Sequence, residues 1–260
     1  MGKIISIVNQ KGGVGKTTTA INLGAALAMF KQKVLIIDYD QQANATIGLG
    51  INREDILFDV SDFFTHIGLL RRAIVKTKIE RLDLIASSIK LANIEESLYM
   101  IPDKEFLLKR KLDMIKNEYD FILIDCPPSL GILTTNALAA ADSVLIPVQC
   151  EYFALEGIMQ LINTIMLAQR KVNPNLDIEG VLLTMFSNTN LGVEVIESIK
   201  GFFKERVYDT IIPRLVRLAE APSHGKPILE YEPRNKGTIA YLNLAKEVID
   251  RNGTEKESAR

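Results

Sequence analysis

The chain has 260 residues, of which 47% are hydrophobic and 24% are charged, and its net charge at pH 7 is -1. This length and apolar content are enough to bury one large core, which excludes a disordered chain and favours a single α/β domain. The balanced charge excludes a strongly basic protein, so binding to nucleic acid or acidic lipid would need a local patch. No apolar stretch reaches the roughly 20 residues of a membrane span, so we expect a cytoplasmic protein without a membrane partner.

Short apolar runs alternate with segments of helical periodicity along the chain. The predicted strands cover residues 4–8, 34–38, 82–86, 121–125, 143–148, 180–185 and 210–213. The predicted helices include residues 17–30, 104–117, 155–169, 193–204 and 238–250, and the weakly periodic segments 41–80 and 214–236 are interpreted as loops with short helices. This alternation predicts an α/β fold with a doubly wound, mostly parallel sheet and helices on both faces. We expect residues 1–250 to form one domain and residues 251–260 to form a flexible polar tail.

A glycine-rich segment, QKGGVGKTT at residues 10–18, follows the first predicted strand and precedes a helix rich in Ala and Leu. Its glycines let successive backbone N–H groups point at phosphate oxygens, and the N-terminus of the following helix adds partial positive charge. In such a P-loop, the lysine before the threonines reaches the β- and γ-phosphates and the first threonine ligates Mg²⁺. We therefore predict a site for ATP and Mg²⁺ formed by Lys11, Gly12, Gly13, Val14, Gly15, Lys16, Thr17 and Thr18.

Two predicted strands end in acidic residues. The run VLIID ends at Asp38 and is followed two residues later by Asp40, and the run FILID ends at Asp125. A carboxylate at the end of an apolar strand is costly to bury unless it binds something, and Mg²⁺ is a natural partner. We therefore expect Asp38 and Asp125 to lie at the metal together with Thr17. The alternative is that either aspartate caps a helix or forms a turn.

The phosphate loop departs from the usual P-loop pattern, because Gln10 stands where a glycine is expected and Lys11 precedes the glycines. In these features the chain resembles the deviant Walker A ATPases, which include ParA partition proteins, MinD and the nitrogenase iron protein. In that family the counterpart of Lys11 reaches across a dimer to the partner's ATP, so the resemblance implies a homodimer that encloses nucleotide. It also implies that Asp125 is the Walker B aspartate. Lys11, Lys16 and Asp40 would then be the catalytic residues, with Asp40 orienting or activating the attacking water.

The resemblance to ParA proteins extends through most of the chain, including residues 44–46, 147–157 and 220–227. It places the adenine near Met185 and Pro213. Two departures stand out. After Asp40 this chain has Gln-Gln-Ala where the family commonly has Pro-Gln-Gly, which should change the stiffness of the loop. The loop at 186–189 lacks an arginine that is often assigned to DNA contact in the family.

The resemblance implies an ATP-dependent dimerisation switch that hydrolyses ATP slowly and takes part in chromosome or plasmid partition. A ParB-type centromere-binding protein would stimulate it. The ATP dimer would bind DNA non-specifically and would therefore associate with the nucleoid. We expect Arg217 to be the principal DNA contact, with further contacts from Arg214, Lys200, Lys204, Lys226, Arg234 and Lys236. The alternative is that these residues form an ordinary solvated surface, because acidic residues are interspersed among them.

Three other functions use the same fold. A MinD-like membrane-cycling regulator needs an amphipathic C-terminal helix, and residues 251–260 offer no apolar face. A reductase with a dimer-bridging cluster would need two cysteines on switch loops, and only Cys126 of the two cysteines has a suitable position. A scaffold that binds ATP without turnover is disfavoured by the presence of both Lys11 and Asp40.

Overall fold

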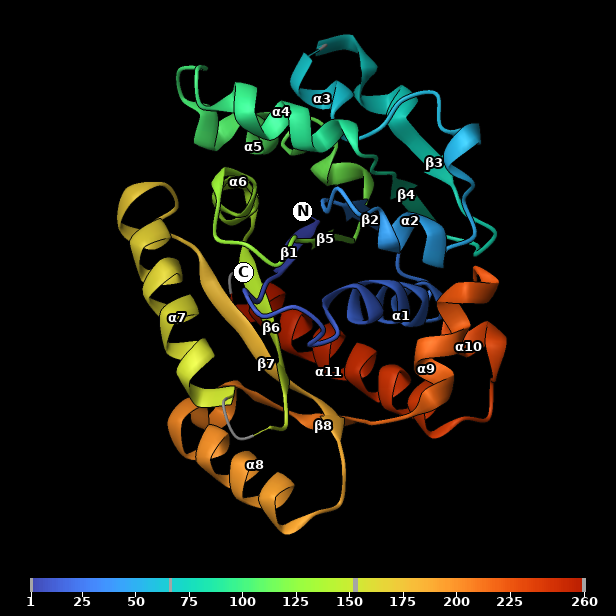
Figure 1. The fold of residues 1–260 in the computed structure, drawn as a ribbon, viewed down its shortest axis with the longest axis vertical. Helices are drawn as coiled ribbons and strands as arrows, with labels where there is room; N and C mark the ends of the chain where they lie inside the picture. Colours follow the sequence, from blue (N-terminus) through green and yellow to red (C-terminus); the bar gives the residue numbers. More distant parts are fainter. Residues whose placement is uncertain (1, 66, 152–153, 259–260) are drawn as a thin grey trace.

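The computed structural model describes residues 2–65, 67–151 and 154–258 (Figure 1). Within these residues, eight strands form one sheet in the order β3-β4-β2-β5-β1-β6-β7-β8. Neighbouring strands are parallel except for the β3 and β4 pair. The strands are β1 (Lys3–Ile7), β2 (Val34–Asp38), β3 (Ile74–Lys76), β4 (Leu82–Ile85), β5 (Phe121–Asp125), β6 (Ser143–Gln149), β7 (Asp177–Phe186) and β8 (Val207–Pro213).

Helices cover both faces of this sheet, as predicted. One apolar core lies between the sheet and α4, α5, α6, α7 and α8, and the other lies between the sheet and α1, α2, α9, α10 and α11. The α-helices are α1 (Lys16–Met29), α2 (Asn44–Gly48), α3 (Asp62–Thr65), α4 (Lys90–Leu98), α5 (Leu107–Leu112), α6 (Ile132–Ala140), α7 (Ala154–Lys171), α8 (Asn190–Phe203), α9 (Val216–Glu220), α10 (Ile228–Tyr231) and α11 (Lys236–Ser258). The 3-10 helices are η1 (Arg53–Asp55), η2 (Ile67–Ala73), η3 (Lys104–Phe106), η4 (Lys116–Glu118), η5 (Lys204–Arg206) and η6 (Ala221–His224).

The central strands β2 and β5 are apolar up to their final aspartate, because helices cover both of their faces. In β2 and β5 every residue is buried, which is the pattern of a parallel sheet inside an α/β fold. The edge strand β3 was not predicted. It has only three residues, none of them buried, and it pairs antiparallel to β4, so its sequence carries no continuous apolar run.

The register of the sheet brings three strand ends together. Asp125 at the end of β5 pairs with Asp38 of β2 on one side and with Ile7 of β1 on the other. The loops that follow β1, β2 and β5 therefore leave the sheet at the same edge. In open α/β sheets, ligands bind at this carboxyl edge, at the point where the strand order reverses.

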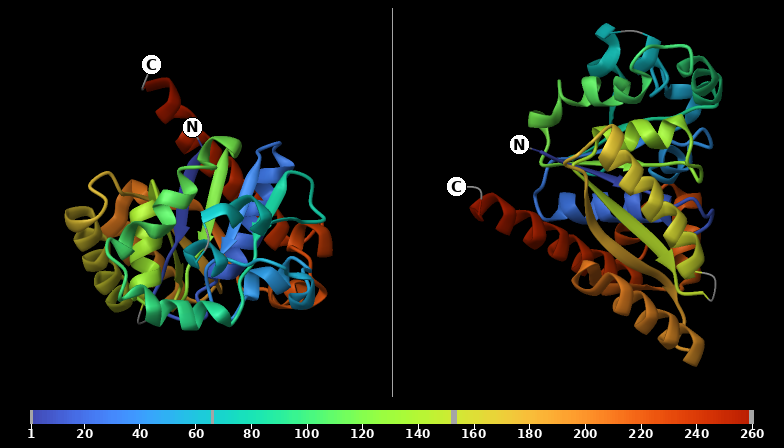
Figure 2. Two further views of the ribbon diagram at one scale, coloured as in Figure 1. Left: turned by 90° about the horizontal axis from the view of Figure 1, so that it is seen from above. Right: turned by 90° about the vertical axis from the view of Figure 1, so that its left-hand side faces the viewer.

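The last helix is longer than predicted. We expected it to end at residue 250, but α11 continues to Ser258 (Figure 2). The Arg251 guanidinium donates to the backbone carbonyls of Glu179 and Val207, and the Asn252 amide donates to the Glu179 carboxylate at 2.8 Å. These contacts hold Arg251 and Asn252, the first two residues of the predicted tail, against β7 and β8. No helix in the described part of the chain is long and apolar enough to cross a membrane.

Candidate nucleotide-binding site

The glycine-rich loop connects β1 to α1 at the carboxyl edge of the sheet. Gly13 and Gly15 have φ angles of 74° and 92°, in the left-handed region where glycine carries no steric penalty. Gly15 immediately precedes α1, and no side chain caps this end of the helix. The first N–H groups of α1 therefore remain available for an anion, as the P-loop prediction requires.

The two lysines of the loop lie in different surroundings. Lys16 is buried, and its ammonium donates to the backbone carbonyl of Lys11 at 3.2 Å. Burial lowers the pKa of Lys16, and the negative charges of Asp125 and Asp40 oppose that shift. The side chain of Lys11 is 43% exposed, and its ammonium lies 3.5 Å from the carboxylate of Glu151. Only one of the two lysines is thus enclosed by its own phosphate loop.

Asp125 is a buried carboxylate that lacks ordinary partners. Neither of its oxygens accepts a hydrogen bond of normal geometry from the described residues. Burial raises its pKa well above the usual range, and the charge of Asp38 adds to the shift. The Thr17 hydroxyl and the Lys16 ammonium lie close enough to oppose it. A hard cation would supply the missing partners, and a carboxylate with a hydroxyl is a donor set that suits Mg²⁺.

Asp38 is equally buried, but its oxygens are engaged by the protein. One oxygen accepts hydrogen bonds from the Thr46 N–H and hydroxyl groups, and the other accepts a bond from the Asp40 N–H at 3.3 Å. Burial raises the pKa of Asp38 to about 6, and the bonds from Thr46 oppose that shift. Asp38 thus holds Thr46 in the short helix α2. Its role as a metal ligand stays a prediction.

Asp40 lies in the tight turn that follows β2. It is 8% exposed, accepts a hydrogen bond from the Gln42 N–H at 3.0 Å, and lies close enough to Lys16 to influence its pKa. The turn ends at Ala43, which is fully buried and has a φ of 55°. A left-handed conformation costs a residue with a Cβ about 1–2 kcal/mol. Ala43 stands where the family commonly has glycine, so this chain carries backbone strain three residues after Asp40, the predicted catalytic aspartate.

A cavity of about 330 Å³ opens beside the phosphate loop. Met185 and Pro213 both line it, as the adenine prediction requires, and so do Gly15 and Thr18 of the phosphate loop. The Thr184 hydroxyl donates to the Val14 carbonyl at 2.8 Å, which ties the end of β7 to the loop. Sequence reasoning missed Thr184, although a polar residue near the end of an apolar strand was a usable signal. The other lining residues are Thr184, Ile212, Arg214, Leu215, Val216, Leu218, Ala219 and Tyr241.

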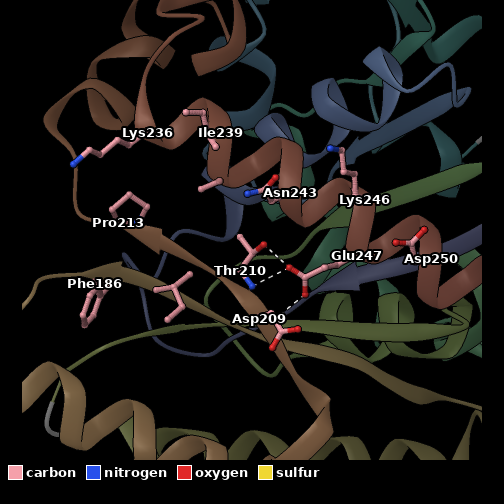
Figure 3. A pocket seen from close by; sticks show the side chains of 12 residues that line it. Phe186, Asp209, Thr210, Pro213, Lys236, Ile239, Asn243, Lys246, Glu247 and Asp250 are labelled. Carbon is pink, nitrogen blue, oxygen red and sulfur yellow. Dashed lines mark hydrogen bonds between the residues drawn. The ribbon is translucent and has the colours of Figure 1, made fainter.

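A larger cavity of about 700 Å³ lies between β8 and α11 and contains no residue of the phosphate loop (Figure 3). In its wall, the carboxylate of Glu247 accepts hydrogen bonds from the N–H groups of Asp209 and Thr210 and from the Thr210 hydroxyl. β8 is the last strand of the sheet. Glu247 therefore satisfies backbone donors along an exposed sheet edge, a structural role that also opposes pairing with another strand.

The seven predicted DNA contacts are all exposed, and they lie on both sides of β8 along the chain. Lys200 and Lys204 lie before the start of β8, whereas the other five follow its end. The strand has seven residues and therefore spans about 23 Å. Arg217 lies 2.7 Å from Glu220 and 3.6 Å from Glu232, so nearby carboxylates already compensate its charge. The role of these residues in DNA binding stays a prediction.

Two residues of the ParA-like segment 147–157, Tyr152 and Phe153, are not among the residues that the structure describes.

The chain is similar to known proteins along most of its length. A family described as an AAA domain matches residues 2–178. The sporulation initiation inhibitor protein Soj of Bacillus subtilis is 56% identical over 249 residues, which cover 95% of this chain and 98% of Soj. The chromosome partitioning protein ParA of Myxococcus xanthus is 48% identical over 252 residues, which cover 96% of this chain and 89% of that protein.

Among solved structures, the cobyrinic acid a,c-diamide synthase of Mycobacterium smegmatis with bound ADP and magnesium superimposes with a TM-score of 0.83. It is 34% identical, and the match covers 95% of this chain and 93% of that one. The phosphate loop, the two aspartates at the strand ends and the sheet order are thus accompanied by similarity along nearly the whole chain. The chain belongs to the ParA/Soj family of P-loop ATPases.

Proposed function

We propose that this protein is an ATP-dependent dimerisation switch that acts in chromosome partition and binds DNA non-specifically as the ATP dimer. The observation that carries the proposal is the contrast between the two lysines of the phosphate loop. Lys16 is buried behind the glycines, whereas Lys11 is exposed and its ammonium contacts Glu151. An exposed lysine beside a phosphate cradle is available to the nucleotide of a second copy, which is the role of an arginine finger in other P-loop enzymes.

Each residue of the site has a separate role in ATP hydrolysis. The N–H groups of the glycine loop and of the start of α1 hold the phosphates, and Lys16 neutralises their charge. Thr17 and Asp125 hold Mg²⁺, which when bound draws charge from the phosphate oxygens. Asp40 orients the attacking water, and the base occupies the cavity beside Met185 and Pro213. Lys11 of one copy completes the site of the other.

The names of the relatives support partition as the process. The chromosome partitioning protein ParA of Myxococcus xanthus and the chromosome-partitioning ATPase Soj of Treponema pallidum match nearly the whole of this chain, at 48% and 47% identity. The cobyrinic acid a,c-diamide synthase is 34% identical. In this function a ParB-type protein stimulates hydrolysis, and the ATP dimer associates with the nucleoid in the cytoplasm. Exposed basic residues around Arg217 supply the DNA contact. Two such surfaces in one dimer would neutralise twice as many phosphates as one monomer does, so dimerisation would strengthen binding.

A membrane-cycling function has no comparable support. The end of α11 carries the polar sequence RNGTEKES, and its first two residues are anchored to β7. An interfacial helix needs an apolar face that can enter the lipid.

The test is sedimentation of the protein without nucleotide, with ADP and with ATP. We expect a dimer only with ATP. Lys11→Ala should bind ATP but remain monomeric, because its own phosphate cradle is intact while the group that reaches the second site is gone. A wild-type protein that stays monomeric in ATP, or a Lys11→Ala variant that dimerises normally, would contradict the proposal.

A further inference from the structure

Glu151 joins two sides of the nucleotide site. One oxygen of its carboxylate lies 3.5 Å from the Lys11 ammonium, and the other lies 3.2 Å from the Arg214 guanidinium. Glu151 follows β6, whereas Arg214 follows β8 and lines the cavity beside the phosphate loop. The Gln149 amide also donates to this carboxylate. A single acidic side chain therefore connects the phosphate loop to the wall of the neighbouring cavity.

We propose that Glu151 is a latch that holds Lys11 in its own protomer and thereby opposes formation of the ATP dimer. This inference rests on the proposed function, in which the Lys11 ammonium reaches the nucleotide of a second copy. Lys11 cannot serve both groups at once, because the carboxylate of Glu151 would then lie beside the partner's phosphates and like charges repel. The ion pair with Glu151 must therefore break before the dimer closes.

Arg214 allows the ion pair between Lys11 and Glu151 to break and form again. When Lys11 leaves, the carboxylate of Glu151 keeps its contacts with Arg214 and Gln149, so it is not left as an uncompensated charge. The side chains of Lys11 and Glu151 are 43% and 47% exposed, and water screens a pair of this kind strongly. Such a pair biases an equilibrium by about two- to fivefold. A bias of this size lowers the fraction of dimer at a low ATP concentration, and a high ATP concentration overcomes it.

The first experiment measures the ATP concentration at which half of the protein is dimeric. Glu151→Gln keeps the shape of the side chain but removes its charge, so the midpoint should fall by about two- to fivefold. The matched control is Glu118→Gln, which removes the same charge from an exposed ion pair with Arg71 before β5, at the opposite end of the sheet. Its midpoint should equal that of the wild type.

The second experiment examines the latch without nucleotide and without a dimer. The protein is treated with a limiting amount of an acylating reagent, and modification of Lys11 is measured by peptide mass spectrometry. Glu151→Gln should accelerate the modification of Lys11, because the ammonium is no longer held. Arg214→Gln should slow it, because Glu151 then lacks its second cation and holds Lys11 more strongly. These opposite effects do not depend on whether the variants dimerise.

The outcomes separate the two proposals. A wild type that dimerises with ATP, together with unchanged midpoint and Lys11 reactivity in Glu151→Gln, would overturn the latch and leave the proposed function standing. A raised midpoint in Glu151→Gln would assign Glu151 to the dimer interface and would also overturn the latch. A wild type that never dimerises would refute the proposed function and the latch with it. Thermal unfolding of each variant establishes that it is folded.

Discussion

Asp38 accepts two hydrogen bonds from Thr46, one from its N–H group at 2.8 Å and one from its hydroxyl at 2.6 Å. The Thr46 hydroxyl in turn accepts a bond from the Ser87 N–H at 3.1 Å. This chain of bonds links the ends of β2 and β4 through the start of α2. Because the loop with Asp40 lies between β2 and α2, its two ends are fixed by the same carboxylate. Asp38 therefore positions the loop that carries Asp40, independently of any contact with a metal.

The raised pKa of Asp38 predicts a pH-dependent stability. The native carboxyl binds its proton up to pH of about 6, whereas the unfolded one releases it near pH 4. Between these values the unfolded state holds fewer protons, so this group makes the nucleotide-free protein less stable as the pH rises, and the loss is complete above about 6. Asp38→Asn should remove this loss. Relative to wild type, the variant should gain up to about 3 kcal/mol between pH 4 and pH 7, measured by urea unfolding.

The change of this stability difference with pH reports the pKa of Asp38. The hydrogen bonds that Asp38→Asn loses lower the stability of the variant by the same amount at every pH. Thr46→Val should instead strengthen the pH dependence, because it removes a hydroxyl bond that lowers the pKa of Asp38 and leaves the carboxyl in place. A stability difference between Asp38→Asn and wild type that does not change with pH would show that Asp38 titrates normally.

The two lysines of the phosphate loop should separate ATP binding from dimerisation. Lys16→Ala should abolish measurable binding of Mg²⁺-ATP in calorimetry, because Lys16 is the only buried lysine in the part of the chain that the structure describes and its ammonium offsets the phosphate charge. Lys11→Ala should bind ATP with nearly wild-type affinity, because its ammonium lies outside. Equal losses of affinity in the two variants would show that both lysines act on the nucleotide of their own protomer.

Asp40→Ala should bind ATP but fail to hydrolyse it, because the phosphate cradle is intact while the group that orients water is absent. The protein should then accumulate as a dimer in ATP. Steady-state phosphate release and sedimentation measure the two effects. Gln42→Ala is the matched control, since its N–H still donates to Asp40. Normal phosphate release by Asp40→Ala would assign the catalytic role to another residue.

Strain at Ala43 should be visible in a comparison of two glycine variants. Ala43→Gly and Ala45→Gly each remove one fully buried methyl group and add the same freedom to the unfolded chain. Only Ala43 has a positive φ. Ala43→Gly should therefore be about 1–2 kcal/mol more stable than Ala45→Gly in urea unfolding. Equal stabilities would mean that the left-handed turn carries no strain in solution.

Arg217→Glu should weaken DNA binding by the ATP dimer. Each copy loses about one phosphate contact, so the slope of log affinity against log salt should fall by about two for a dimer. The control is Arg110→Glu, because Arg110 is similarly exposed and pairs with Asp103. Filter binding across a salt series gives both slopes. Wild-type affinity and slope in Arg217→Glu would remove this residue from the DNA contact, and absence of binding by the wild type would count against partition.

The sequence predicted those parts of the fold that depend on local pattern. The strands β2 and β5 are buried at every position, so their apolar runs were unambiguous. Gly13 and Gly15 have the left-handed conformations that the phosphate loop demands, so its motif predicted both its shape and its location. The cavity that includes Met185 was expected only through the family resemblance.

Features that depend on distant polar partners were missed. Nothing near Thr46 in the sequence indicates that its hydroxyl binds Asp38 and accepts from Ser87. Likewise, Arg251 and Asn252 resemble a solvated tail in composition, but their partners lie on β7, about 70 residues earlier. Pairings of this kind become visible only when the register of the sheet is known.

The bond between Thr184 and Val14 has a consequence for how the protein is made. The phosphate loop occupies residues 10–18, but the hydroxyl that donates to its Val14 carbonyl belongs to a residue 170 positions later. The strand before the loop, β1, pairs with β5 and β6, which begin only at Phe121 and Ser143. A chain that emerges from the ribosome N-terminus first therefore exposes its glycine loop long before the neighbours that shape it exist. The bond that ties β7 to the phosphate loop therefore forms only after Thr184 has been added, so the loop acquires its final surroundings late in synthesis.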